Sequence, residues 1–178
     1  MALSTFQGPV RSLNGFISQG PGTTKTVSTA TATLDVANFS GRIINITAAT
    51  TTITLPVINA SADPASAGPG SDPNTLNNLG TTFTFFFGVT ATAVKILCGG
   101  TGTPGDLFFG TIDLAVANGA SSLFAPNGSS NDAMNFNGTT TGGILGSYVT
   151  VTAVAANRWL VVGQVVGSST LATPFGDS

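Results

Sequence analysis

TTFTFFFGV, residues 81–89, is the strongest strand signal in this chain. Successive side chains of a strand point to opposite faces, so Phe83, Phe85 and Phe87 share one face and Phe86 lies on the other with two threonines. Three aromatic rings on one face predict a strand that anchors a hydrophobic core, with Phe86 needing cover of its own. The alternative is an aromatic platform that stacks on sugars or bases, and we favour core packing over it.

Two pairs of apolar, β-branched runs elsewhere in the chain predict β-hairpins. Residues 42–46 and 51–56, separated by a short Thr/Ala segment, form the first pair. Residues 147–154 and 158–166, joined by a three-residue turn, form the second pair. Trp159, the one tryptophan of the chain, begins the return strand of the second hairpin. It is expected to cap one end of the core.

Helix formers are scarce in this sequence. All seven acidic residues are aspartates, and 23 Gly and 9 Pro interrupt the chain too often for a long helix. Further short strands are expected at residues 25–34, 94–97, 106–116 and 121–124. We therefore predict an all-β fold, a β-sandwich or small β-barrel of about eight antiparallel strands.

The beginning of the chain differs from the rest. Residues 1–24 contain Gly-Pro steps and no strand or helix periodicity, which predicts an extended N-terminal arm before a single β domain at residues 25–178. Large apolar side chains in the arm favour a latch that orders on a partner over a disordered end. A second turn-rich segment, residues 59–80, is longer than ordinary connections and is expected to be functional or mobile.

Ionisable side chains are rare and exclude most catalytic chemistry. Charged residues make up 7% of the chain, against about 25% in ordinary soluble domains. Histidine is missing, so acid–base catalysis would depend on aspartates alone, and most of these stand beside turn residues. Zinc and iron sites need His or Cys. We predict no enzyme activity, no catalytic residues, no metal site and no cofactor, with incidental Ca²⁺ at the Asp-containing loops as the alternative considered.

The single cysteine and the scattered cations also bear on which classes of partner the chain can bind. Cys98 lies in an apolar run and is interpreted as a small buried side chain. The net charge is −2, and no cluster of cations faces a phosphate backbone, which predicts no nucleic-acid partner. No apolar run approaches the roughly 20 residues of a spanning helix, which predicts no membrane partner. The first residues contain no secretory signal, so synthesis in a cytoplasm is expected. The five cations are Arg11, Lys25, Arg42, Lys95 and Arg158.

Several segments together resemble the head decoration (cement) proteins of tailed bacteriophages. They are GPVRS at residues 8–12, ITLP at 53–56, FTF at 83–85, and the closing hairpin that contains NRWLVVG at 157–163. The likeness spans most of residues 40–166. The same order of motifs also occurs in phage tail and fibre modules.

This resemblance implies a virion structural protein on the capsid surface, made in the host cytoplasm. Such proteins commonly form homotrimers whose arms reach across neighbouring major capsid protein subunits. The alternative is a tail or fibre module that binds a host receptor or glycan. For the arm, the residues that we predict to contact the capsid are Phe6, Val10, Arg11 and Phe16.

Overall fold

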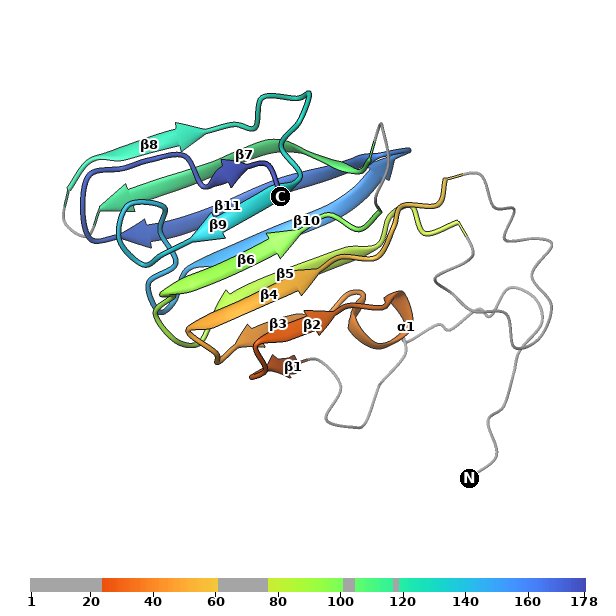
Figure 1. The fold of residues 1–178 in the computed structure, drawn as a ribbon, viewed down its shortest axis with the longest axis horizontal. Coiled ribbons are helices and arrows are strands. Elements are labelled where there is room, and N and C mark those ends of the chain that lie inside the picture. The colour runs from red at the N-terminus through yellow and green to blue at the C-terminus, as the bar shows by residue number, and fades with distance from the viewer. Residues whose placement is uncertain (1–23, 61–76, 101–104, 117–118) are drawn as a thin grey trace, which may run out of the picture.

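The computed structural model describes residues 24–60, 77–100, 105–116 and 119–178, and two β-sheets face each other across its interior (Figure 1). The predicted all-β class is confirmed. The seven-stranded sheet has the order β1 (Thr24–Val27), β3 (Ile43–Ile46), β5 (Thr82–Phe87), β10 (Tyr148–Ala155), β11 (Arg158–Gly167), β7 (Leu107–Val116), β8 (Ser121–Phe124). The five-stranded sheet has the order β12 (Phe175–Gly176), β9 (Ala133–Phe136), β6 (Ala93–Leu97), β4 (Thr50–Thr54), β2 (Thr31–Thr33).

The first half of the described chain winds between the two sheets, one strand at a time (Figure 1). β1, β3 and β5 are parallel neighbours in one sheet, and β2, β4 and β6 are parallel neighbours in the other. The segments that connect the two sheets in successive windings are also joined by backbone hydrogen bonds. The Thr47 N–H donates to the Val27 carbonyl at 2.9 Å, and the Thr92 N–H donates to the Ala49 carbonyl at 2.7 Å. This half is therefore a coil of three turns.

This winding corrects the first predicted hairpin. Residues 42–46 and 51–56 do not pair, because β3 and β4 lie in different sheets. Ile44 of β3 and Ile53 of β4 are both buried and face the same interior from opposite sides. Alternation in the sequence specifies which side chains point inward, and it leaves the pairing partner of each strand undetermined.

The predicted continuous strand at residues 25–34 is also wrong. The chain bends at residues 28–30, so β1 and β2 belong to different sheets. Val27 and Leu34 are both buried although they have opposite parity in a single strand. The one-turn helix α1 (Val36–Phe39) follows, and the Asp35 carboxylate caps it by accepting the Asn38 N–H at 2.8 Å.

The second half of the chain is mostly antiparallel. The predicted hairpin near the C-terminus is confirmed as β10 and β11, and β10 pairs on its other side with β5. β7, however, runs parallel to β11 over ten residue pairs. Both sheets are therefore mixed, and the expected set of about eight antiparallel strands becomes twelve strands of both directions in the described residues.

Aromatic side chains of β5 lie at the centre of the interior, as predicted. Phe83, Phe85 and Phe87 have no solvent exposure. The Phe83 ring lies 5.9 Å from that of Trp159, and the Phe87 ring meets Phe136 edge-on at 5.1 Å. Burying each such side chain contributes roughly 1.5–3 kcal/mol. The core thus joins strands from both sheets around β5.

Gly110 in β7 is a position that other residues cannot occupy without strain. Its φ of +105° lies in the region that favours glycine. A Cβ added there would overlap the Val161 carbonyl oxygen of the parallel neighbour β11. Gly110 therefore allows β7 and β11 to approach each other closely.

Replacing Gly110 by alanine is expected to lower the free energy of unfolding by roughly 2–5 kcal/mol, from backbone strain and overlap together. Gly146→Ala is the matched control, because Gly146 has φ +93° and nothing within 4 Å of an added Cβ. It should cost only about 1–2 kcal/mol. Urea unfolding of both variants checks this, and equal losses would refute the role of the β7–β11 contact.

Candidate functional site: the outer face of the seven-stranded sheet

The outward side of the seven-stranded sheet carries most of the exposed large apolar side chains of the described chain. Alternation along each strand sends one set of residues into the core and the other set to this side. We call this side the outer face. Its exposed apolar members are Ile43, Phe86, Leu123, Tyr148, Val154, Leu160 and Val162.

The register of the strands makes these side chains neighbours. Phe86 lies opposite Tyr148, which lies opposite Gln164 on β11. One step along, the row that begins at Ile43 crosses Thr84 and Thr150 and reaches Val162. The face is a continuous surface because the sheet brings residues as distant in sequence as Ile43 and Val162 into one row.

Three pairs of polar side chains on this face are hydrogen-bonded to one another. The hydroxyls of Thr82 and Thr152 are 3.0 Å apart, and those of Thr84 and Thr150 are 3.1 Å apart. The Tyr148 hydroxyl donates to Gln164 Oε1 at 3.2 Å. These six side chains have partners within the sheet, so covering them costs little, whereas the Asn45 Oδ1 of β3 on the same face has no hydrogen-bond partner among the described residues.

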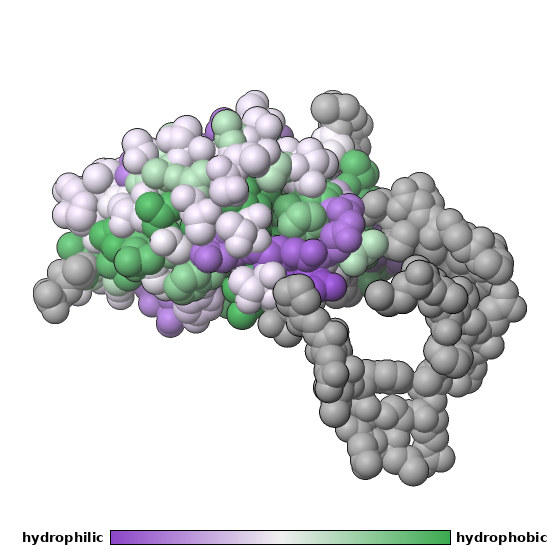
Figure 2. Space-filling model, turned by 90° about the horizontal axis from the view of Figure 1, so that it is seen from below, coloured by the Kyte–Doolittle hydropathy of each residue, from purple (hydrophilic) through white to green (hydrophobic). Residues whose placement is uncertain are grey.

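Two charged side chains, Arg158 and Asp113, lie on this face in the described part of the chain. The Arg158 guanidinium sits 5.3 Å from the centre of the Phe109 ring, so its cation is stacked on an aromatic neighbour. Asp113 stands opposite Gln164 on β11. The described surface seen from the β1 and β2 side is mostly of intermediate hydropathy, with apolar patches and hydrophilic residues gathered mainly in one band (Figure 2).

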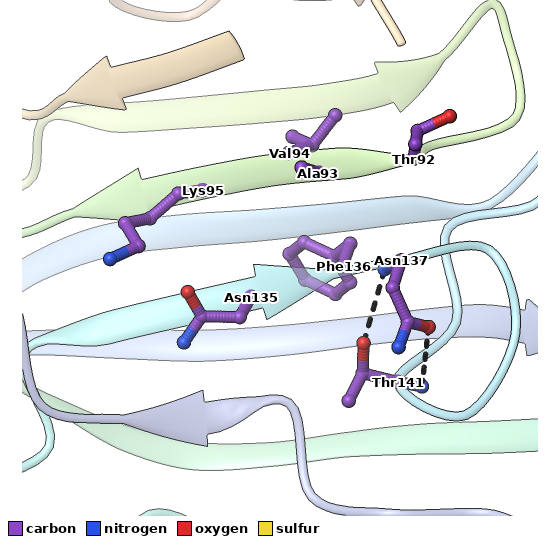
Figure 3. Close-up of a pocket in the computed structure, with 8 residues that line it drawn as sticks. All are labelled: Thr92, Ala93, Val94, Lys95, Asn135, Phe136, Asn137 and Thr141. Atoms are coloured by element: carbon purple, nitrogen blue, oxygen red, sulfur yellow. Dashed lines mark hydrogen bonds between the residues drawn. The ribbon is translucent and has the colours of Figure 1, made fainter. Parts of the chain in front are cut away.

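The outward side of the five-stranded sheet is polar by comparison. Its strands expose threonines together with Lys95 of β6 and Asn135 of β9, which lie opposite each other. A shallow hollow of about 250 Å³ opens beside them (Figure 3). The Asn137 side chain accepts the Thr141 N–H at 3.1 Å, so it is used to shape the loop that forms one wall. The hollow is small and open, and one cation is its only charge.

Asp106 is the buried carboxylate of the described chain. Its Oδ2 accepts the Ile58 N–H at 2.8 Å and thereby ties the segment after β4 to the start of β7. Burial raises the pKa of Asp106, and the hydrogen bond from Ile58 partly offsets the rise. The Trp159 indole N–H, which has no hydrogen bond of normal geometry among the described residues, offsets the rise further.

Cys98 lies half-buried against the core, in agreement with its interpretation as a small packed side chain. Burial raises the pKa of the Cys98 thiol far above its ordinary value, and the charges of Asp106 and Asp132 raise it further. The thiol therefore stays protonated and is a poor nucleophile. Within the described ranges, no group of three or more His, Cys, Asp or Glu is placed to hold a metal ion.

The predicted capsid contacts Phe6, Val10, Arg11 and Phe16 lie outside the described residues. Thr24, placed in the predicted arm, belongs to β1. The outer face was not predicted from the sequence, although two features of the sequence indicated it. Phe86 needed cover of its own, and it lies on this face with 38% of its surface exposed. Leu160 and Val162 gave a second signal, since β11 is apolar at both parities.

Comparison of the chain with protein-family models, curated proteins and solved structures gives no match. Among the described residues, none of the helices is long and apolar enough to cross a membrane.

The carboxyl group of Asp106 both ionises and accepts the Ile58 N–H, and the variants Asp106→Asn and Asp106→Ala separate these two properties. Because the pKa of Asp106 is raised above 3.8, the folded state binds this proton more tightly than the unfolded state. The contribution of Asp106 to the stability of the unmodified protein therefore falls as the pH rises from about 3.8 through the higher pKa of the folded state. Asp106→Asn cannot ionise, so its stability relative to the unmodified protein should increase between about pH 3 and pH 7.

Asp106→Ala also removes the acceptor of the Ile58 N–H, so it should be less stable than Asp106→Asn by about 1–3 kcal/mol at every pH. Urea unfolding across the pH range measures both differences, and the other aspartates cancel because all three proteins share them. Parallel pH profiles for the Asn variant and the unmodified protein would contradict the raised pKa.

Proposed function

We propose that this chain is a virion structural protein that decorates and stabilises an assembled bacteriophage capsid. In this proposal it acts as a homotrimer that clamps neighbouring major capsid protein subunits. The observation that carries the proposal is the outer face, a broad apolar surface on which two pairs of threonines already hydrogen-bond to each other. Such a face suits permanent contact with protein more than it suits turnover of a substrate.

The proposed mechanism is thermodynamic linkage. A protein that binds only the assembled shell lowers the free energy of that state relative to free subunits. At a free concentration 100 times the dissociation constant, each occupied site contributes about 2.7 kcal/mol. A near-neutral chain with few charges avoids long-range repulsion between the many copies that a shell displays.

The arm takes the capsid-facing role in this proposal. Phe6, Val10, Arg11 and Phe16 supply apolar anchors and one cation to the major capsid protein, and the β domain supplies the body that is held in place. The chain is taken as a non-enzyme, because its buried carboxylate serves a backbone hydrogen bond and its thiol is held protonated.

The number of copies in each particle tests the proposal. Quantitative mass spectrometry of purified virions, with the major capsid protein as internal reference, should give on the order of hundreds of copies, as expected for a component that repeats with the shell symmetry. About a dozen copies or fewer would instead place the chain in the tail, as a receptor- or glycan-binding module, and would overturn the capsid role.

The same experiment with a variant that lacks residues 1–23 tests the arm. This deletion leaves β1 complete. Occupancy of the capsid should fall by about tenfold or more, because every apolar anchor of the arm is lost. Unchanged occupancy would show that the capsid is bound through another surface.

A further inference from the structure

We infer that the outer face is the surface through which copies of this chain contact one another. The inference rests on the proposed function only in that copies of the chain associate, and it names the partner of the outer face as a second copy in a two-fold pair. The capsid contacts of the proposal are residues of the arm, and the outer face is built from other residues, so the two can be tested with separate variants.

In an isolated chain, the apolar side chains of the face remain in contact with water and contribute little hydrophobic stabilisation. Leu160, Val162 and Val154 alternate with core residues on β10 and β11, at the middle of the sheet, and have exposed fractions of 39%, 57% and 48%. Contact with a matching surface removes this area from water, and that removal is the main driving force of protein association.

The size of the face fits a stable interface. Seven strands at roughly 4.8 Å spacing span about 29 Å, and β11 from Arg158 to Gln164 spans about 20 Å. Two copies in contact over this area bury on the order of 1,200 Å², which reaches the lower end of specific interfaces.

The charges of the face complement each other between two copies. Arg158 and Asp113 have opposite signs and lie about 20 Å apart along β11 and β7. A second copy in the opposite orientation brings its Asp113 to Arg158 and its Arg158 to Asp113. One chain thus supplies both halves of each ion pair, which is the pattern expected of a surface that recognises itself.

Val162→Lys and Val57→Lys form the matched pair that tests this interface. Both valines are exposed, at 57% and 54%, but Val57 follows β4 and lies off the face. The mass of the full-length chain is measured by light scattering over a range of concentrations, with thermal melting as the check that each variant is folded. Val162→Lys should raise the dissociation constant of the oligomer roughly 100-fold or more, because a lysine is buried without a partner.

The Val57→Lys variant should keep the mass of the unmodified chain. A monomeric unmodified chain, or equal effects of the two folded variants, would overturn the inference. A dimer supports this two-fold interface and replaces the three-fold arrangement of the proposed function, whereas a trimer would overturn the reciprocal pairing, because a two-fold contact closes with two copies. A monomeric chain whose capsid occupancy is lost in Val162→Lys would overturn the inference and assign the face to the capsid instead, and the capsid role of the proposed function would stand without its homotrimer.

A charge exchange tests the orientation. Arg158→Asp and Asp113→Arg should each weaken the oligomer by about tenfold, since each places like charges together across the interface. The double variant restores opposite charges and should return the dissociation constant to within about threefold of the original value. Additive weakening in the folded double variant would overturn the pairing of Arg158 with Asp113.

Discussion

The packing of β5 against both of its neighbours is the constraint on which the rest of the structure depends. β5 pairs in parallel with β3 on one side and antiparallel with β10 on the other, so it joins the coiled first half to the hairpin of the second half. Its inward phenylalanines reach side chains of both sheets, including Phe136 across the interior. Loss of this strand would separate two units that have no other shared ladder in the seven-stranded sheet.

The same alternation that fills the core also creates the outer face. Each inward ring or valine on β5, β10 and β11 is followed by an outward residue, and on these strands many of the outward residues are apolar as well. A strand that is apolar on both sides is typical of one covered on both sides. The five-stranded sheet has threonines at the outward positions of β4 and Lys95 on β6, so the two layers of the sandwich present different surfaces. Most of the exposed apolar surface is therefore on one layer.

The scarcity of charge has a structural counterpart in Asp106. A carboxylate is costly to bury, and here it is retained because it satisfies the Ile58 N–H, which an apolar side chain cannot do. The neighbouring Cys98 is made less reactive by the same burial and by this negative charge. Of the ionisable groups near the core, Asp106 thus supports the fold by a hydrogen bond and Cys98 stays protonated.

The sequence by itself determined the all-β class, the inward face of β5 and the hairpin of β10 and β11, because alternation and a short turn are local properties. The tertiary structure alone decided that β3 and β4 lie in opposite sheets and that β7 runs parallel to β11, since a strand offers the same backbone groups to any partner. It also decided that Ile43, Tyr148 and Val162 share one surface. Side chains so distant in sequence become neighbours only through register, and register is set by the packing of the whole core.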